Sequence, residues 1–140
     1  MSHRWIEGEG LRTIYAFAPR FTASAKRDGP TTVHLDFGSS EIYEEGQEFR
    51  VTKLTFEHVI EYEWNDFEFN RLSANPEDVQ LGLIEVIDSQ LIAQILSTGR
   101  YAGERLCHMR ISFDDHGTYD VVCQRVAISY GASADDEYYV

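Results

Sequence analysis

The sequence predicts a mainly β domain, a single antiparallel β-sandwich or open barrel of about seven strands with one short helix near residues 89–98. Three observations support this. Apolar and polar residues alternate along much of the chain, only one segment has apolar residues at helical spacing, and 140 residues with 43% hydrophobic content suffice for one core. We therefore treat residues 1–140 as one domain.

The first elements in chain order are a loop and a strand. Residues 18–30 contain the turn signal Asp28-Gly29-Pro30 and are expected to form a loop. The next segment is expected to be a half-buried strand, because Val33, Leu35 and Phe37 alternate with polar residues.

The segment from Phe49 to Trp64 predicts a long strand whose apolar phase changes near residues 52–53, where we expect a bulge or break. His58 falls on the apolar phase among aromatic and aliphatic residues, as do Tyr62 and Trp64. We expect Tyr62 and Trp64 in the core, and a role as anchors for a partner is the alternative. A buried, hydrogen-bonded histidine is the first interpretation of His58, and a ligand-pocket residue is the alternative. The opposite face carries a row of glutamates: Glu57, Glu61 and Glu63.

Residues 81–88 are almost continuously apolar and predict a central strand covered on both faces. A short helix follows. Asp88 or Ser89 can cap its start, and Gly99 suits a left-handed C-terminal position. Its apolar stripe is expected to dock on the sheet and comprises Leu91, Ile92, Ile95 and Leu96.

Residues 105–113 and 118–128 are expected to form a hairpin with Gly117 at positive φ. The favoured register pairs Phe113 with Tyr119 and places Asp114, Asp115, His116 and Asp120 in water, as turn and surface residues. Asp120 then lies opposite Ser112, with Arg110 as a diagonal neighbour able to form a surface ion pair. Cys107 and Cys123 then share a face but lie diagonally, which disfavours a disulfide. Residues 131–140 are expected to be a mobile acidic tail.

The formal net charge is -12, and residues 41–88 hold three basic and thirteen acidic groups, a net of -10. Such an acidic segment repels nucleic-acid phosphates and attracts a basic protein partner; keeping the protein soluble is the alternative role of this charge. No apolar run is long enough to cross a membrane, and the first residues lack a signal peptide, so a cytoplasmic location is expected.

Standard catalytic motifs are missing, so we expect no catalytic, metal or cofactor site. An enzyme using His34 and Asp36, which share a strand face, is the minor alternative. The expected site is a partner-binding acidic surface formed by Glu57, Glu61, Glu63, Asp66 and Glu68.

Three stretches resemble a loose group of small, uncharacterised bacterial β-rich proteins, some of them classed as immunity proteins of toxin systems: "LTFEHVIEYEWNDFEFN", "GLIEVIDSQLIAQIL" and "HMRISFDDHGTYDVVCQRVAI". The resemblance covers about residues 48–130 and implies a β-rich body with one short helix before an FDD-x-G hairpin. It carries no catalytic residue. The function expected is therefore a cytoplasmic protein-binding domain, with neutralisation of a basic toxin or effector as its specific form. A small-ligand-binding barrel and a structural subunit of a larger assembly are the alternatives.

Overall fold

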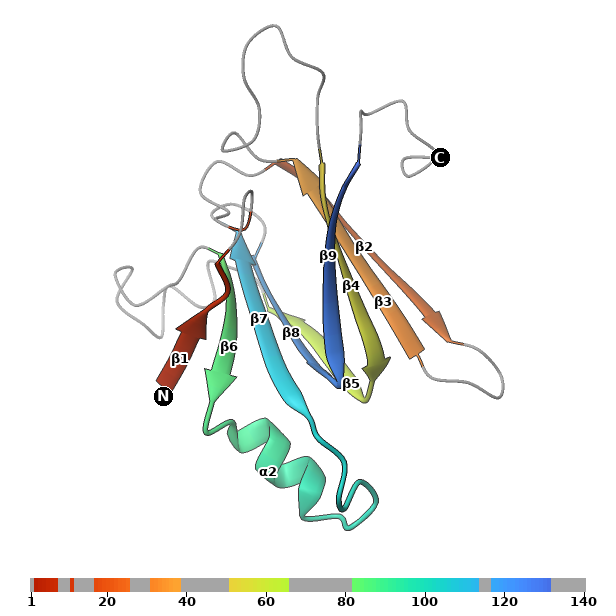
Figure 1. Cartoon of the computed structure of the whole chain (residues 1–140), viewed down its shortest axis with the longest axis vertical. Coiled ribbons are helices and arrows are strands. Elements are labelled where there is room, and N and C mark those ends of the chain that lie inside the picture. Colours follow the sequence, from red (N-terminus) through yellow and green to blue (C-terminus); the bar gives the residue numbers. More distant parts are fainter. Residues whose placement is uncertain are drawn as a thin grey trace, which may run out of the picture.

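The computed structural model describes residues 2–7, 11, 17–25, 31–38, 51–65, 82–113 and 117–131. Within these residues nine strands form two antiparallel sheets, and one short helix lies at the end of the larger sheet (Figure 1). This confirms the mainly β prediction, in its sandwich form. No helix in the described part of the chain is long and apolar enough to span a membrane.

The smaller sheet has four strands in the order β2-β3-β4-β9: Phe17–Ala25, Thr31–Gly38, Val51–Val59 and Arg125–Gly131. Strand β3 confirms the alternating prediction, since Val33, Leu35 and Phe37 are fully buried. The expected loop at 18–30 is wrong over its first half, because β2 runs through residue 25 and pairs with β3. Tertiary pairing here overrides a segment that contains a proline and alternates only weakly.

The larger sheet has five strands in the order β1-β6-β7-β8-β5: Ser2–Trp5, Leu83–Ile87, Cys107–Phe113, Gly117–Cys123 and Glu61–Asn65. Strand β6 lies between β1 and β7, with Leu83, Ile84 and Val86 buried on its two faces, as the apolar run predicted. The central position explains why this strand lacks alternation.

Two chain segments pass from one sheet to the other and so join the layers. Strand β4 becomes β5 at Ile60, and β8 becomes β9 at Gln124. The two segments stay hydrogen-bonded through the bend: Ile60 N donates to Val122 O at 2.8 Å, and Gln124 N donates to Glu57 O at 3.1 Å. The predictions of one long strand from Phe49 to Trp64 and of one strand over 118–128 are therefore wrong, because each segment contains two strands in different sheets.

The irregularity of β4 lies at its end. The expected bulge near residues 52–53 is wrong, since Asp36 pairs with Lys53 and the register stays regular there. The pairing with β3 shifts after Phe56, where His58 adopts φ 55. An extra residue at this point bends the strand toward the other sheet. It also turns His58 outward, so this side chain is exposed and the expected burial of His58 is wrong.

The core fills the space between the sheets. Phe37, Phe56 and Phe113 are fully buried, and Phe37 meets Phe113 edge-on with ring centroids 5.1 Å apart. Apolar side chains from β3, β4, β6, β7 and β8 complete this cluster, together with Leu11. Burial of this apolar surface is the main force that holds the two sheets together.

The β7–β8 hairpin keeps the predicted faces but not the predicted register. Ile111 pairs with Tyr119 and Phe113 with Gly117, a slip of two residues from expectation. A two-residue slip conserves which face each side chain occupies, because the side-chain period in a strand is two. Gly117 has the predicted positive φ, 106°. Residues 114–116 of the turn and 132–140 of the expected tail lie outside the described residues.

Helix α2 (Gln90–Leu96) confirms the predicted helix and its N-cap, whereas its C-cap is Ser97, so the helix ends earlier than the predicted residue 98. The Ser89 hydroxyl accepts the Ile92 N–H at 3.1 Å as N-cap, and Gly99 has φ 76. The apolar stripe is half-buried rather than fully covered, and Leu96 is 40% exposed. The helix lies beyond the β6 and β7 ends, as Figure 1 shows.

Candidate functional site

Strand β5 is an edge of the five-stranded sheet and carries the most exposed aromatic pair of the described residues. Tyr62 is 45% exposed and Trp64 is 48% exposed. Glu61 and Glu63 alternate with them and are exposed on the other face. We call Glu61–Asn65 the β5 edge. Among the described strands only β8 pairs with it, and an edge strand is the place where a sheet can take up another strand.

The two aromatic side chains of the β5 edge pack against other described residues of the protein. Tyr62 lies 5.1 Å from the ring of Phe21, and Phe21 stacks on Tyr119 at 5.0 Å. Trp64 covers Gly117, where an added Cβ would come within 2.6 Å of the indole Nε1. The expected core position of Tyr62 and Trp64 is therefore wrong: they point toward the inter-sheet space but lie at its open rim.

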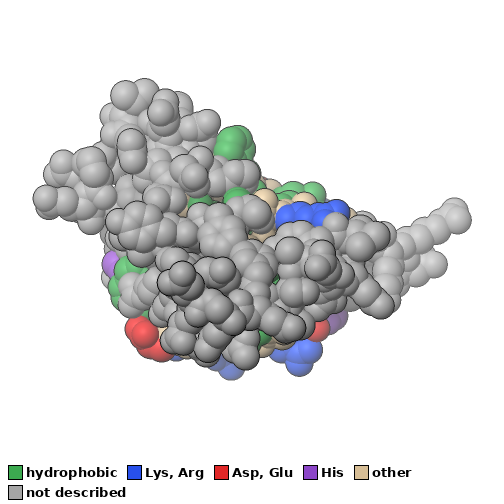
Figure 2. Space-filling view, turned by 90° about the horizontal axis from the view of Figure 1, so that it is seen from above, with side chains coloured by type: hydrophobic (Ala, Val, Ile, Leu, Met, Phe, Trp, Pro, Cys, Tyr) green, Lys and Arg blue, Asp and Glu red, His purple; other side chains and the backbone are tan. Residues whose placement is uncertain are grey.

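The predicted acidic row is divided by the fold. Glu57 lies on β4 in the other sheet and forms an ion pair with Arg125 across the strand pair. Glu61 and Glu63 lie together on β5. Asp66 and Glu68 lie outside the described residues. Figure 2 shows basic as well as acidic side chains among the described residues on the face it draws.

His34 and Asp36 share the outer face of the four-stranded sheet, as predicted, but make separate contacts. His34 Nδ1 lies 3.2 Å from the Thr55 hydroxyl. Asp36 is 6% exposed, and its Oδ1 atom has no hydrogen-bond partner. Burial raises the pKa of Asp36 from 3.8 to about 7, although Lys53 and Arg20 act in the opposite direction. This carboxyl is therefore held in a neutral or easily protonated form.

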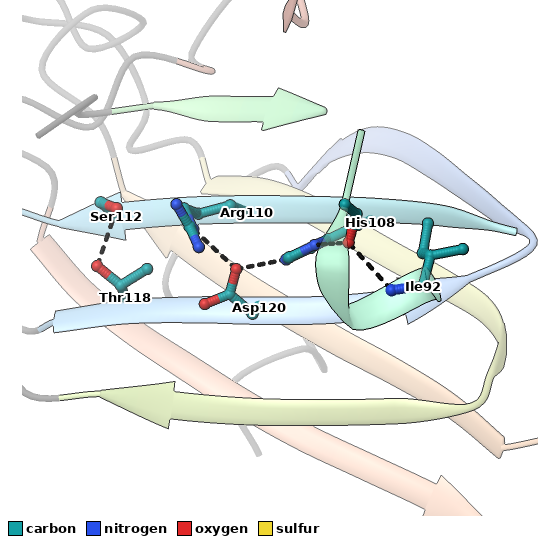
Figure 3. A network of polar contacts seen from close by, with 7 residues as sticks. Ile92, His108, Arg110, Ser112, Thr118 and Asp120 are labelled. Carbon is teal, nitrogen blue, oxygen red and sulfur yellow. Dashed lines mark hydrogen bonds and ion pairs between the residues drawn. The ribbon is translucent and has the colours of Figure 1, made fainter. Parts of the chain in front are cut away.

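A buried polar network on the outer face of the larger sheet links β7, β8 and α2 (Figure 3). His108 Nε2 donates to Asp120 Oδ1 at 2.6 Å, and Arg110 Nε donates to the same oxygen at 2.8 Å. The Ser89 hydroxyl lies 2.7 Å from His108 Nδ1 while it also caps α2 through Ile92. Ser112 and Thr118 form a neighbouring hydroxyl pair at 2.9 Å.

The expectation that Asp120 faces water is wrong, since it is 3% exposed. Burial alone would raise the pKa of Asp120, but hydrogen bonds from His108 and Arg110 outweigh burial and lower it. The carboxylate therefore stays ionised and fixes the imidazole with Nε2 protonated. In the neutral imidazole Nδ1 is then the acceptor, so the Ser89 hydroxyl donates to it and keeps a lone pair for the Ile92 N–H.

The order Ser89–His108–Asp120 is that of the hydrogen bonds in a serine hydrolase triad. Here two members also make structural contacts. Ser89 caps the helix, and Asp120 binds Arg110 of the adjacent strand. The network thus pins α2 to the sheet through one continuous chain of contacts. Within the described residues, no group of three His, Cys, Asp or Glu side chains could hold a metal ion.

The sequence interpretation missed this network because its hairpin register placed Asp120 opposite Ser112 instead of Arg110. The useful signal was the polar set at alternate positions 108, 110 and 112, facing 118 and 120. Polar residues that face each other on a strand pair can form a buried hydrogen-bond network as well as a solvent-exposed surface. No protein-family model, curated protein or solved structure matches this chain.

Proposed function

We propose that this protein is a binding module that docks a basic, extended segment of a partner protein on the β5 edge. The observation that supports this most is the composition of that strand: two half-exposed aromatics alternate with two exposed carboxylates on an edge strand. An added strand would gain backbone hydrogen bonds from the edge and side-chain contacts from both faces.

The aromatic side chains supply the binding energy in this proposal. Tyr and Trp are the residue types most often found as anchors, and burying one under a partner is commonly worth about 2 kcal/mol. Because Phe21 and Gly117 already position Tyr62 and Trp64, little side-chain entropy is lost on binding. The supported rings therefore favour a specific contact rather than a nonspecific one.

The carboxylates supply the choice of partner. Glu61 and Glu63 lie within the segment 41–88, whose net charge is -10. A basic segment is attracted by this charge, and its association is faster at low salt. An immunity-type role, in which the basic segment belongs to a toxin or effector, is a specific form of the proposal. It agrees with the resemblance of residues 48–130 to such proteins.

The test uses a synthetic peptide of alternating lysine and valine as the probe and Trp64 fluorescence as the readout. Trp5→Phe removes the other tryptophan and leaves Trp64 as the reporter. In that background, reversing both glutamates with Glu61→Lys and Glu63→Lys should weaken binding by about tenfold or more at low salt, about 1.4 kcal/mol. Glu57 is left intact because it holds Arg125 at the bend.

The matched control reverses two exposed carboxylates away from β5, with Glu7→Lys and Glu104→Lys, and carries the same change in net charge. If binding depends on the β5 edge, the control keeps most of its affinity. Equal weakening of both double variants would show that only overall charge matters, and the proposal would then be wrong. A free energy of unfolding measured for each variant separates lost binding from lost folding.

A further inference from the structure

The two cysteines form a second chemical feature that the binding proposal does not use. Cys107 on β7 and Cys123 on β8 are direct cross-strand partners, with sulfur atoms 3.7 Å apart. The diagonal placement expected from the sequence is wrong, because the hairpin register differs by two residues. Direct antiparallel partners have Cα atoms about 4.5–5.5 Å apart, which lies within the range that a disulfide spans.

The two thiols differ in access. Cys123 is fully buried, whereas Cys107 is half-buried and lines a cleft of about 290 Å³ at the open end of the sandwich. The cleft lies between β1, β6 and β7 on one side and the start of β9 on the other. A reagent in solution therefore reaches Cys107 first, and Cys123 only through Cys107.

Arginine side chains dominate the charge of this cleft. Arg4, Arg105 and Arg125 line it, and Glu85 is the carboxylate among the lining residues. Arg4 pairs with Glu85 at 2.5 Å, and Arg125 pairs with Glu57 of β4. Arg105 takes part in none of the ion pairs between described residues, and it is exposed. The cleft thus keeps an excess of positive charge beside a thiol in an otherwise acidic protein.

The hydrogen bonds between Cys107 and Cys123 indicate which of the two thiols acts as the nucleophile. The Cys107 thiol lies 3.3 Å from the Cys123 carbonyl oxygen, to which it donates when protonated. Once deprotonated, Cys107 accepts the S–H of Cys123. This hydrogen bond lowers the pKa of Cys107, with a further contribution from Arg105 against burial and Glu85, and the same contact raises the pKa of Cys123. Cys107 is therefore the attacking sulfur.

We infer that Cys107 is a thiol-exchange site for a small anionic disulfide held in the arginine-lined cleft, and that Cys123 resolves the adduct into a Cys107–Cys123 disulfide. In the first step the Cys107 thiolate bonds to one sulfur of the small disulfide. The S–S bond breaks, and the leaving sulfur takes its electron pair and then a proton from water.

In the second step Cys123 attacks Cys107 Sγ, and its proton passes to the departing sulfur of the small molecule. The intramolecular disulfide forms and the second small thiol is released. Overall, two protein thiols are oxidised and one small disulfide is reduced to two thiols. The sulfur atoms must approach from 3.7 Å to about 2 Å, a change that side-chain rotation within the strand pair can supply.

The experiment treats the full-length reduced protein with oxidised glutathione as the anionic probe and follows intact mass with time. The wild type should pass through a mixed disulfide to a product that has lost two hydrogen atoms. Cys123→Ser should accumulate the mixed disulfide on Cys107. Cys107→Ser should stay unmodified while folded, because Cys123 is fully buried. Modification of Cys107→Ser at the wild-type rate, or a Cys123→Ser variant that stays unmodified, would overturn the inference.

The charge of the cleft is tested with a second pair of variants. Arg105→Ala should slow the first step with oxidised glutathione by about threefold to tenfold at low salt and leave the rate with neutral 2-hydroxyethyl disulfide unchanged. Arg100→Ala is the matched control, since Arg100 is also exposed but does not line the cleft. Equal rates for both arginine variants with glutathione would contradict the anionic specificity. Unfolding midpoints confirm that each variant is folded.

Discussion

Replacing Asp36 by Asn tests whether burial of this carboxyl lowers the free energy of unfolding. Asp36 lies on β3, an inner strand of the four-stranded sheet, and its cross-strand neighbours are Arg20 of β2 and Lys53 of β4. Its Oδ1 atom is buried without a hydrogen bond. Asn has nearly the same shape but no charge to desolvate. We expect Asp36→Asn to stabilise the protein at neutral and alkaline pH and to have little effect in acid.

The magnitude follows from the pKa. Asp36 titrates at about 7 in the fold against an ordinary value of 3.8. Between these values the folded protein holds a proton that the unfolded chain has released, so stability falls as pH rises from about 4 to 7. At about 1.4 kcal/mol for each pKa unit, the full loss is about 4 kcal/mol. Water that reaches the carboxyl as the fold relaxes reduces the cost of burying its charge. We therefore expect the loss of unfolding free energy to be about 2–4 kcal/mol.

The assay is urea denaturation of wild type and Asp36→Asn at pH 4 and pH 8. The difference in unfolding free energy between the two proteins should be small at pH 4 and about 2–4 kcal/mol in favour of Asn at pH 8. Glu63→Gln, which removes an exposed carboxylate, serves as the control. A wild type that is more stable than Asp36→Asn at pH 8 would refute the reasoning, because it would mean that Lys53 and Arg20 outweigh burial.

Three further changes probe the support of the β5 edge and the polar network. Gly117→Ala should destabilise the protein by about 3 kcal/mol and shift Trp64 emission, because φ is 106 and a Cβ would meet Asn65 O at 2.4 Å; unchanged emission would contradict the packing of Trp64 on Gly117. His108→Phe should lower the free energy of unfolding, measured with urea or heat, by about 3 kcal/mol, because it leaves the buried Asp120 with Arg110 as its charged partner. An unchanged free energy of unfolding would mean that the network contributes no net stability. Asp120→Asn should flatten the acid limb of the pH–stability profile, because the lowered pKa of Asp120 stabilises the fold above about pH 3.8 and this is lost as pH falls; an unaltered acid limb would show that Asp120 is not the group responsible.

Much of the fold was predictable because local physics decides it. The alternation at Val33, Leu35 and Phe37, the cap at Ser89 and the glycines at 99 and 117 each have one dominant cause, and all appear as expected. The sheet switches at Ile60 and Gln124 were not predictable in this way. Alternation continues across Ile60, so the residue pattern there does not mark where the strand leaves one sheet for the other. At Gln124 the core-facing apolar positions shift from 119, 121 and 123 to 126 and 128, and such a shift is compatible with a bulge in one strand as well as with a change of sheet.

The candidate sites were predictable only where they depend on a single strand. Glu61 and Glu63 could be placed together because they are two residues apart on β5. The contacts of Asp120 and Cys107 depend on the hairpin register, and a slip of two residues changed both partners while leaving the faces intact. Hydrophobic patterning does not distinguish registers that differ by two, so turn geometry decides between them.

Amide hydrogen exchange across the described residues, with and without the lysine–valine peptide, tests the proposed docking on the β5 edge most directly. We expect slower exchange at Glu61–Asn65 when the peptide is bound, with the other edge strand of the same sheet, β1, unchanged. Protection confined to β1, or to the four-stranded sheet, with β5 exchanging as before, would contradict it.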